Sequence, residues 1–553
     1  MKNLTWQNPE QLFVAQELIN KVKSKCCGIK VKLVSLAIAM ACAAPSFAGG
    51  LLTNTNQHVA FNRMMSREAS IGIDGVYYNP AGVVFMGEGK HLAINWQLAY
   101  QTRSIENDYP LFTNNVNNPI TPREFKGKAF APVIPSFQYA YNKGRWSLQA
   151  GFALTGGGGK CTFDDGLGSF EKIVAETAIA ACQLAGAVDK VASQYGVPAV
   201  FTDKNAFGTK GQYSYNSYMH GRQYYYGLSL GAAYKFSDNF SAFAGVRGVY
   251  ASTNYYGYVE DIKVGNMPLY KVLDPTKETA ANIELSCDQS GVGFTPIIGV
   301  DFKTGKWNFT AKYEFKTRIR LKNKSVNQVP SIGNLPGNLR NAYIAGGVPE
   351  QAADAILANP AISGEKDANG NIVKPGAMQM LKTQFDTKLD EAIGEYADGK
   401  KIAGDIPAYL ALGVGYSPVN TVRVNVGFHW FDDKHATSYN NRQEKLDRGT
   451  LEYNAGVEVD VNKKITLSTG WQNTNYGLSD EYMDDKSFVV SSNSAAVGGV
   501  YHINKKMDLN VAYFHTFYQH KKTSETVKQT GKDYTSDYTR NNNVFAVGLD
   551  INF

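Results

Sequence analysis

The sequence predicts an all-β protein, a 14-stranded antiparallel transmembrane β-barrel with an N-terminal luminal hatch and partly helical extracellular loops. Three observations support this prediction. Many segments alternate apolar and polar residues, short and long connections alternate between these segments, and the last segment runs to the final residue, Phe553. In a membrane barrel the lipid-facing and lumen-facing side chains alternate along every strand, so this pattern places each strand between two different surroundings.

Residues 1–48 form a predicted presequence. An apolar stretch at 31–44 follows lysines at positions 21, 23, 25, 30 and 32 and leads to the triplet Ser46-Phe47-Ala48. This pattern is typical of a secretory signal peptide, and we expect cleavage before Gly49. A membrane-spanning anchor is the alternative, but a spanning helix needs about 20 apolar residues.

The composition argues against a nucleic-acid partner. The chain has 553 residues and a net charge of +7, and the presequence contains six lysines and two acidic residues, so about +3 remains without it. That charge is not gathered into the basic face that nucleic-acid binding requires. No metal-ligand spacing is present, and no cofactor is predicted. Outside the presequence the cysteines are Cys161, Cys182 and Cys287, which suit an oxidising compartment but cannot all pair. Cys161 and Cys182 flank one loop insertion and are the first choice for a disulfide.

Segment 306–321 shows the alternation best. Its apolar side chains share one face, and the opposite face carries polar ones, among them Lys316, Arg318 and Arg320. Counting all segments of this kind gives an even number, which lets the sheet close with both ends on the same side. The fourteen predicted strands are 90–102, 132–142, 144–156, 222–236, 239–254, 291–303, 306–321, 405–417, 420–433, 449–461, 464–476, 488–503, 506–520 and 541–553.

The connections predict the orientation. Tight polar turns at 142–144, 237–239, 304–306, 417–420, 462–464 and 504–506 alternate with long connections. We expect the short turns and both termini on the periplasmic side and the long loops outside the cell. A soluble all-β domain, the alternative, has no reason to keep this strict order. Helical periodicity predicts helices within the loops at Ser169–Tyr195, Glu350–Ala358 and Met378–Tyr396.

Residues 49–89 precede the first strand and show no outward alternation. The lumen of a fourteen-stranded barrel is wide enough to hold such a segment, so we interpret 49–89 as a hatch and 90–553 as the barrel. The hatch contains the run Asn79-Pro80-Ala81-Gly82.

This run, placed just before the first strand of a fourteen-stranded barrel, resembles the FadL family of fatty-acid transporters, whose hatch carries an Asn-Pro-Ala motif. Residues 130–135 (FAPVIP) and 404–407 (GDIP) stand where that family has proline-containing strand openings. The resemblance covers nearly the whole mature chain. It implies passive uptake of long-chain fatty acids or other hydrophobic compounds: binding in the outer loops and lumen, hatch rearrangement, and lateral release into the membrane through a kinked third strand.

The predicted third strand ends in Gly156, Gly157, Gly158 and Gly159. Glycine permits bulges and bends in sheets, so this run is the candidate lateral opening. A flexible strand end leading into a loop is the plain alternative. A phosphate-binding loop is a further one, but it requires Ser or Thr after the lysine, and Cys161 follows Lys160.

A fatty-acid carboxylate that leaves water needs a positive partner. The candidate carboxylate-binding residues lie on predicted inward faces or at the outer ends of strands: Lys316, Arg318, Arg320, Arg247 and Lys434. The alternative is that neighbouring acidic residues such as Glu314, Glu452 and Glu458 neutralise these cations.

The predicted partners are a hydrophobic small molecule such as a fatty acid, outer-membrane lipid, and the barrel-assembly machinery, for which Phe553 is the signal. We expect a monomer in the bacterial outer membrane and no enzymatic activity. A general diffusion porin is the first alternative. An outer-membrane hydrolase is the second; it needs a nucleophile beside a base such as His429 or His515, and no serine motif accompanies them.

Overall fold

The computed structural model describes residues 51–193, 210–330, 334–345, 347–376, 394–527 and 530–553. The predicted presequence 1–48 therefore lies outside the described residues. Most of the predicted helix Met378–Tyr396 lies outside them as well.

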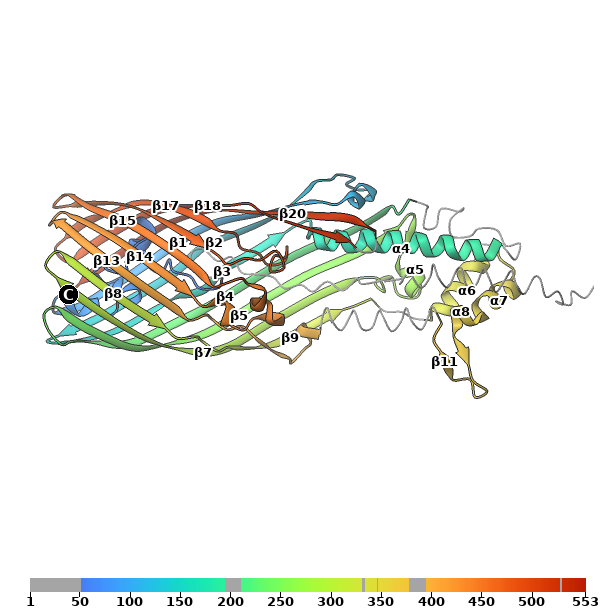
Figure 1. The fold of residues 1–553 in the computed structure, drawn as a ribbon, viewed down its shortest axis with the longest axis horizontal. Helices are drawn as coiled ribbons and strands as arrows, with labels where there is room; N and C mark the ends of the chain where they lie inside the picture. The colour runs from blue at the N-terminus through green and yellow to red at the C-terminus, as the bar shows by residue number, and fades with distance from the viewer. Residues whose placement is uncertain (1–50, 194–209, 331–333, 346, 377–393, 528–529) are drawn as a thin grey trace, which may run out of the picture.

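The chain forms a closed antiparallel barrel of 14 crossings (Figure 1), and the predicted fold class is confirmed. β8 and β9, β12 and β13, and β18 and β19 lie end to end, and each pair makes one crossing, while β6 only extends the edge beside β5. The barrel closes where β1 pairs with β20. The strands are β1 (Gly89–Asp108), β2 (Arg123–Lys143), β3 (Trp146–Phe163), β4 (Tyr213–Lys235), β5 (Phe240–Val264), β6 (Met267–Pro268), β7 (Ile283–Thr304), β8 (Trp307–Glu314), β9 (Arg320–Gln328), β12 (Lys401–Ala403), β13 (Tyr409–Val419), β14 (Val422–Phe431), β15 (Thr450–Asn462), β16 (Ile465–Asn475), β17 (Ser492–Asn504), β18 (Met507–Tyr518), β19 (Lys521–Val527) and β20 (Lys532–Asn552).

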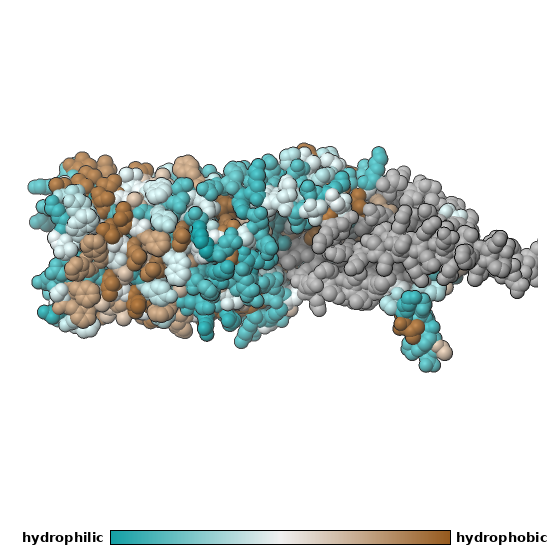
Figure 2. All heavy atoms as spheres, viewed as in Figure 1, coloured by the Kyte–Doolittle hydropathy of each residue, from teal (hydrophilic) through white to brown (hydrophobic). Residues whose placement is uncertain are grey.

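Large apolar side chains face outward around the short-turn end of the barrel. On the face that Figure 2 shows, they gather over that end, and the described surface beyond it is mainly hydrophilic. Val292 and Phe294 of β7 are 65% and 69% exposed. An apolar outer band of this kind is the surface that a barrel presents to lipid.

Several strands begin or end more than five residues beyond their predicted bounds, and these extensions lie at the long-loop end. β4 begins at Tyr213 rather than at residue 222, and β7 begins at Ile283 rather than at 291. In these extensions the apolar side chains point inward: Ile283 and Leu285 are buried, whereas Val292 and Phe294 farther along the same strand face outward. The preference reverses because water, rather than lipid, surrounds the extensions.

The predicted strand 306–321 is not continuous. β8 ends at Glu314 and β9 begins at Arg320, and an isolated bridge between Thr317 and Ile406 lies between them. The irregular residues shift the alternation by one position, and such a shift exchanges the two faces of a strand.

Residues 51–88, the hatch, lie inside the barrel (Figure 1) and are mostly buried. They contain the short helices α2 (Val59–Met64), α3 (Gly75–Tyr78) and η1 (Gly82–Phe85). The side chain of His58 accepts a hydrogen bond from the backbone nitrogen of Ala60 and so caps α2. The short helices of the hatch contact β1 to β5, β15 to β18 and β20. Hatch residues also bond to Asp301 of β7, Lys312 of β8 and Asn425 of β14.

Helices are found in the long loops, as predicted. α4 (Gly168–Ser193) follows β3, and α7 (Glu350–Ala358) has the predicted bounds. None of the helices in the described residues is long and apolar enough to cross a membrane. The other elements outside the barrel wall are η2 (Pro110–Asn114), α5 (Tyr270–Leu273), α6 (Leu335–Ala345), α8 (Pro360–Ser363), β10 (Glu365–Lys366), β11 (Ile372–Lys374), η3 (Gly394–Tyr396), η4 (Asp433–His435) and η5 (Tyr439–Lys445).

The two ends of the described chain lie at opposite ends of the barrel. The backbone nitrogen of Phe553 donates to the carbonyl of Lys90 at the short-turn end. The backbone nitrogen of Leu51 donates to Asp433 Oδ1 at 3.3 Å, just beyond the long-loop end of β14. The described chain therefore enters the barrel at the long-loop end, and the position of Met1 lies outside the described residues.

Candidate functional site

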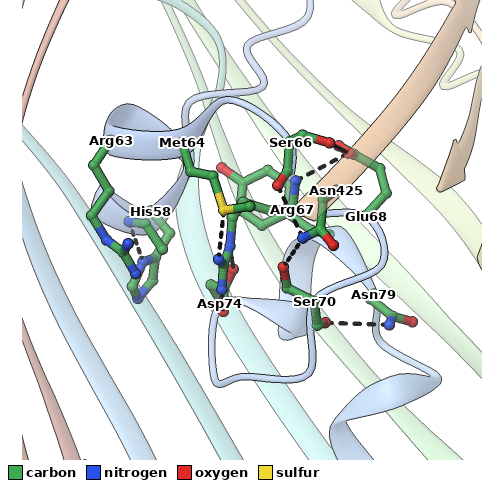
Figure 3. Close-up of polar contacts among 12 residues, drawn as sticks. His58, Arg63, Met64, Ser66, Arg67, Glu68, Ser70, Asp74, Asn79 and Asn425 are labelled. Atoms are coloured by element: carbon green, nitrogen blue, oxygen red, sulfur yellow. Dashed lines mark hydrogen bonds and ion pairs between the residues drawn. The ribbon is translucent and has the colours of Figure 1, made fainter. Parts of the chain in front are cut away.

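One side of the hatch is held to the barrel wall by buried charges. Figure 3 shows Arg67 bonded to Asp74 within the hatch, and Asn425 of β14 beside Ser66 and Ser70. Arg67 makes two bonds to Asp74, at 2.7 and 3.1 Å, and its Nη1 lies 3.1 Å from Glu458 Oε2 of β15. Arg63 pairs with the same carboxylate, and Arg423 Nε lies 3.1 Å from Glu458 Oε1. Glu458 is only 7% exposed. Because an uncompensated buried charge is costly, these pairs tie the hatch to β15.

A second buried chain of contacts runs beside the first. His429 Nε2 of β14 lies 2.7 Å from Glu68 Oε1 of the hatch, and its Nδ1 lies 2.8 Å from Glu452 Oε2 of β15. The imidazole is fully buried, and the two carboxylates are buried with it. The hatch is thus joined to two neighbouring strands by one ring.

The run Asn79-Pro80-Ala81-Gly82 fixes the hatch to the opposite part of the wall. Asn79 Nδ2 donates to Asp301 Oδ2 at 2.6 Å, and the backbone nitrogen of Gly82 donates to Asn79 Oδ1. The carbonyls of Pro80 and Ala81 accept from Gln149 of β3 and Ser241 of β5. A Cβ on Gly82 would lie 2.9 Å from Asp301 Oδ2. The run therefore anchors the hatch to β3, β5 and β7.

Pairing between β2 and β3 is interrupted. The two strands pair from Gly127 to Ala129 and again from Phe137 onward, while residues 130–136 and 153–160 do not pair with each other. β3 also carries two extra residues, Thr155 and Gly158, against β4. Gly157 and Gly158 have φ of +71° and +132°, a backbone conformation that favours glycine. We call residues 130–136 of β2 and 153–160 of β3 the β2–β3 interruption.

The predicted glycine run thus lies inside β3 rather than at its end. The strand continues to Phe163 and pairs again with both neighbours after the run. The prediction that this run ends the strand is wrong, because glycine here allows two bulges without ending the strand.

The first residues of the hatch occupy the lumen side of the interruption. The backbone nitrogen of Asn54 donates to the carbonyl of Thr155 at 2.9 Å. Asn54 Nδ2 donates to the carbonyls of Leu154 and Gly157, and Gln57 Nε2 also donates to Leu154. These bonds satisfy backbone carbonyls of β3 that have no partner on β2.

The surroundings of the interruption are apolar. Met65 of the hatch packs with Ala131 and Ile134 of β2 and Leu154 of β3 in one buried cluster. On the outer side, Val133 is 61% exposed, where lipid would contact it. A cavity of about 10 Å³ lies beside Thr155 in the lumen, which is room for about one water molecule.

The candidate carboxylate-binding residues do not form a site. Arg318 and Arg320 are exposed, Lys316 Nζ bonds to the carbonyl of His435, and Lys434 is exposed on η4. The inward ladder of Lys316, Arg318 and Arg320 was a wrong prediction, because the irregular residues after Glu314 exchange the faces of the strand.

Only Arg247 among these candidates is buried in the lumen. Its Nη2 lies 3.0 Å from Glu314 Oε1, and its Nη1 contacts the other oxygen of that carboxylate. Lys312 Nζ lies 3.0 Å from the same Glu314 Oε1. The alternative prediction, that acidic neighbours neutralise the lumen cations, describes Arg247.

No disulfide joins Cys161 to Cys182 in the structure, contrary to prediction. Cys161 lies within β3 and is buried, and Cys182 lies on α4. The prediction failed because Cys161 was taken to border a loop, whereas β3 extends two residues beyond it.

Several residues that hold the hatch carried no sequence signal. Asn54, Gln57, Arg67 and Glu68 are ordinary polar residues of a loop-like segment. The available clue was the number of polar residues in a segment that must be buried to fill a lumen. Residues 53–57, shortly before α2, are all polar, and three of them, Asn54, Asn56 and Gln57, carry amides.

Comparisons with known proteins show the fold. No family model matches the sequence, and no curated protein matches it. A solved structure of a Pseudomonas aeruginosa FadL homologue matches with a TM-score of 0.55 and 13% identity, over 91% of this chain and 100% of that one. The Pseudomonas putida toluene transporter TodX (TM-score 0.47, 12% identity, 87% and 94% covered) and the Ralstonia pickettii toluene transporter TbuX (0.44, 13%, 87% and 94%) are also similar. The chain thus has the fold of the FadL homologue.

Proposed function

We propose that this protein lies in the bacterial outer membrane and carries hydrophobic compounds, long-chain fatty acids among them, passively into that membrane. The observation that supports this most is the β2–β3 interruption, which lies within the apolar outer band and has the hatch on its lumen side. A molecule released there passes from the barrel into lipid without crossing the polar short-turn end.

Transport requires the hatch to move. The cavity beside Thr155 holds about one water molecule, so no hydrophobic substrate fits there while residues 53–57 are in place. Displacement of Asn54 and Gln57 would free the carbonyls of Leu154 and Gly157 and open the lumen to the interruption. The predicted hatch, residues 49–89, is thus the moving part of the proposed mechanism.

Deletion of both Thr155 and Gly158 tests lateral release. Removing the two extra residues restores regular pairing with β4, and an even number leaves the inward and outward faces of β3 unchanged. We expect the barrel to assemble and uptake of radiolabelled dodecane, by host cells that lack their own hydrophobic-compound channel, to fall at least tenfold.

The control is Gly248→Ala in β5, where an added Cβ meets Phe294 at an ordinary 3.7 Å. It should leave uptake unchanged. Unchanged uptake in an assembled double-deletion barrel would contradict lateral release.

Neither alternative gains support. A diffusion porin needs an open lumen, and here the hatch fills it. A hydrolase needs a nucleophile beside its base. His429, His435 and His520 bond to carboxylates and His515 bonds to Asn543, and no hydroxyl or thiol of the described residues bonds to these four rings. We propose a monomer, and we keep Phe553 as the proposed signal for the assembly machinery.

A further inference from the structure

Two buried arginines lie side by side in the barrel wall above the hatch. Arg103 of β1 and Arg540 of β20 are direct neighbours in the pairing that closes the barrel, and both face the lumen. They are 2% and 5% exposed. We call them the Arg103–Arg540 pair.

An aromatic side chain covers the pair from the lumen. The ring of Phe488, from the loop between β16 and β17, lies 6.0 Å from the Arg103 guanidinium carbon and 5.8 Å from that of Arg540. Tyr518 lies 5.6 Å from Arg540. Gln101 Oε1 accepts a bond of 3.2 Å from each arginine. The two cations therefore share one neutral acceptor in an aromatic environment.

The charge of Arg540 has no counter-ion within the part of the chain that the structure describes. Among the described residues no carboxylate lies within ion-pair distance of it, and its Nε and Nη1 are buried without a hydrogen-bond partner. Asn542, the next inward residue on β20, is fully buried, and its Nδ2 and Oδ1 also lack partners. Like charges at neighbouring sheet positions repel each other, and burial adds to that cost.

Three more buried arginines of the lumen are neutralised, unlike Arg540. Arg63 and Arg67 share Glu458, and Arg247 is held by Glu314. Three donor nitrogens without partners, on two neighbouring inward residues and beside a second guanidinium, suit an oxyanion.

The pair also lies at the start of an apolar path to the interruption. Val544 is the next inward residue after Asn542 and belongs to the buried cluster that contains Met65 and Leu154. Arg540 and Val544 are four residues apart, or roughly 13 Å along the strand. An anionic group at Arg540 would therefore point an attached alkyl chain toward the β2–β3 interruption.

We propose that the Arg103–Arg540 pair, with Asn542, is a binding site for the oxyanion head of an anionic amphiphile, above the hatch. Arg540 Nε and Nη1 and Asn542 Nδ2 donate to the anion, and the alkyl chain lies against Val544 and Met65. The site rests on the proposed function for its place on the transport path, and it gives the chain a preference for acids over neutral compounds of equal length.

The test compares sodium laurate with 1-dodecanol, which has an equally long chain and no charge, by calorimetric titration of the full-length barrel in nonionic detergent. Arg540→Met should weaken laurate binding on the order of tenfold to a hundredfold, as expected for charge-assisted hydrogen bonds, and leave dodecanol binding unchanged. Loss of a buried unpaired charge should not weaken the barrel. Arg340→Met, at a partly exposed arginine of α6 paired with Asp354, is the control and should change the binding of neither ligand.

Equal weakening of laurate and dodecanol binding in Arg540→Met, or unchanged laurate binding, would contradict the proposed anion site. If the Arg540→Met chain does not assemble, Asn542→Leu replaces it, with a several-fold loss expected for laurate alone. Dodecane uptake in cells separates the two proposals. A wild-type barrel that binds laurate through Arg540 but carries no dodecane would keep the anion site and contradict the proposed transport.

Discussion

The two sides of the hatch are held by different kinds of bond. On the side of β14 and β15, Arg67 and Glu68 meet Glu458 and His429 through buried charged contacts. On the side of β3, Asn54 and other neutral amides donate to backbone carbonyls at the interruption. Breaking a buried ion pair costs about 3–5 kcal/mol, whereas a neutral hydrogen bond contributes about 1 kcal/mol.

This difference bears on which side would move in the proposed mechanism. There, the hatch stays fixed to β14 and β15 while its first residues leave the interruption. A hatch released on all sides would instead leave the barrel as an open pore. Four predictions separate these cases.

The largest effect should come from Glu458→Gln. The change leaves the guanidinium of Arg63 buried without its carboxylate, so we expect the free energy of unfolding to fall by about 3–5 kcal/mol. The urea midpoint of tryptophan fluorescence measures it, and the conductance in planar bilayers should rise as the hatch loosens. Glu365→Gln, in an exposed pair with Lys374, is the control and should cost at most about 1 kcal/mol. Equal effects of the two changes would argue against charge-based anchoring.

A smaller decrease in the free energy of unfolding is expected for Asn79→Ala. It removes the bond to Asp301 and the cap on Gly82, and we expect about 2 kcal/mol of destabilisation, since each bond contributes roughly 1 kcal/mol. The control is Asn118→Ala, at a second Asn-Pro dipeptide in the loop after β1. If both variants unfold at the wild-type urea midpoint, the run is not an anchor.

Asn54→Ala should act on transport more than on stability. It removes two side-chain bonds at the interruption, at a cost of about 1–2 kcal/mol, and so favours the open arrangement. We expect the initial rate of dodecane uptake to rise several-fold, with the conductance unchanged because β14 and β15 still hold the hatch. A slower rate would mean that the resting contact is needed for release.

The smallest effect concerns pH at the long-loop end. Burial raises the pKa of Asp433 to about 6, even though the hydrogen bonds from Thr450 and Leu51 oppose this rise. A carboxyl whose pKa is higher in the folded than in the unfolded state stabilises the fold at low pH and loses that contribution as the pH rises through 6. The unfolding midpoint should therefore drop slightly between pH 5 and 7.5, and Asp433→Asn should remove this step. A step that persists in the variant belongs to another group.

Strand number, turn positions and the loop helices α4 and α7 followed from the sequence, since alternation and turn residues are local signals. The outward direction of the Arg318 and Arg320 side chains did not follow from the sequence. Above the lipid the apolar side chains point inward, and the irregularity after Glu314 shifts the strand by one position. Each change alone would interrupt the alternation of apolar and polar residues along the sequence, and together they leave it unbroken. Phe315, which faces outward, and Ile319, which faces inward, therefore belong to the same apolar series.

Part of the candidate site could also be predicted from the sequence. The glycine run marked the irregular part of β3, because few other residues tolerate φ of +71° or +132°. The loss of pairing with β2 and the role of Asn54 depend on contacts between residues about a hundred positions apart, which no local pattern encodes.

The strands also differ in length around the barrel. β5 has 25 residues and β14 has 10, which correspond to roughly 80 and 33 Å along the strand. The rim is therefore oblique: a tall back formed by β4, β5 and β7 stands opposite a low front at β14 to β16. Under the proposed function, a compound in the layer of lipid head groups would have the shorter way over the edge of the sheet at β14 to β16, so the protein has a direction within the plane of the membrane as well as across it.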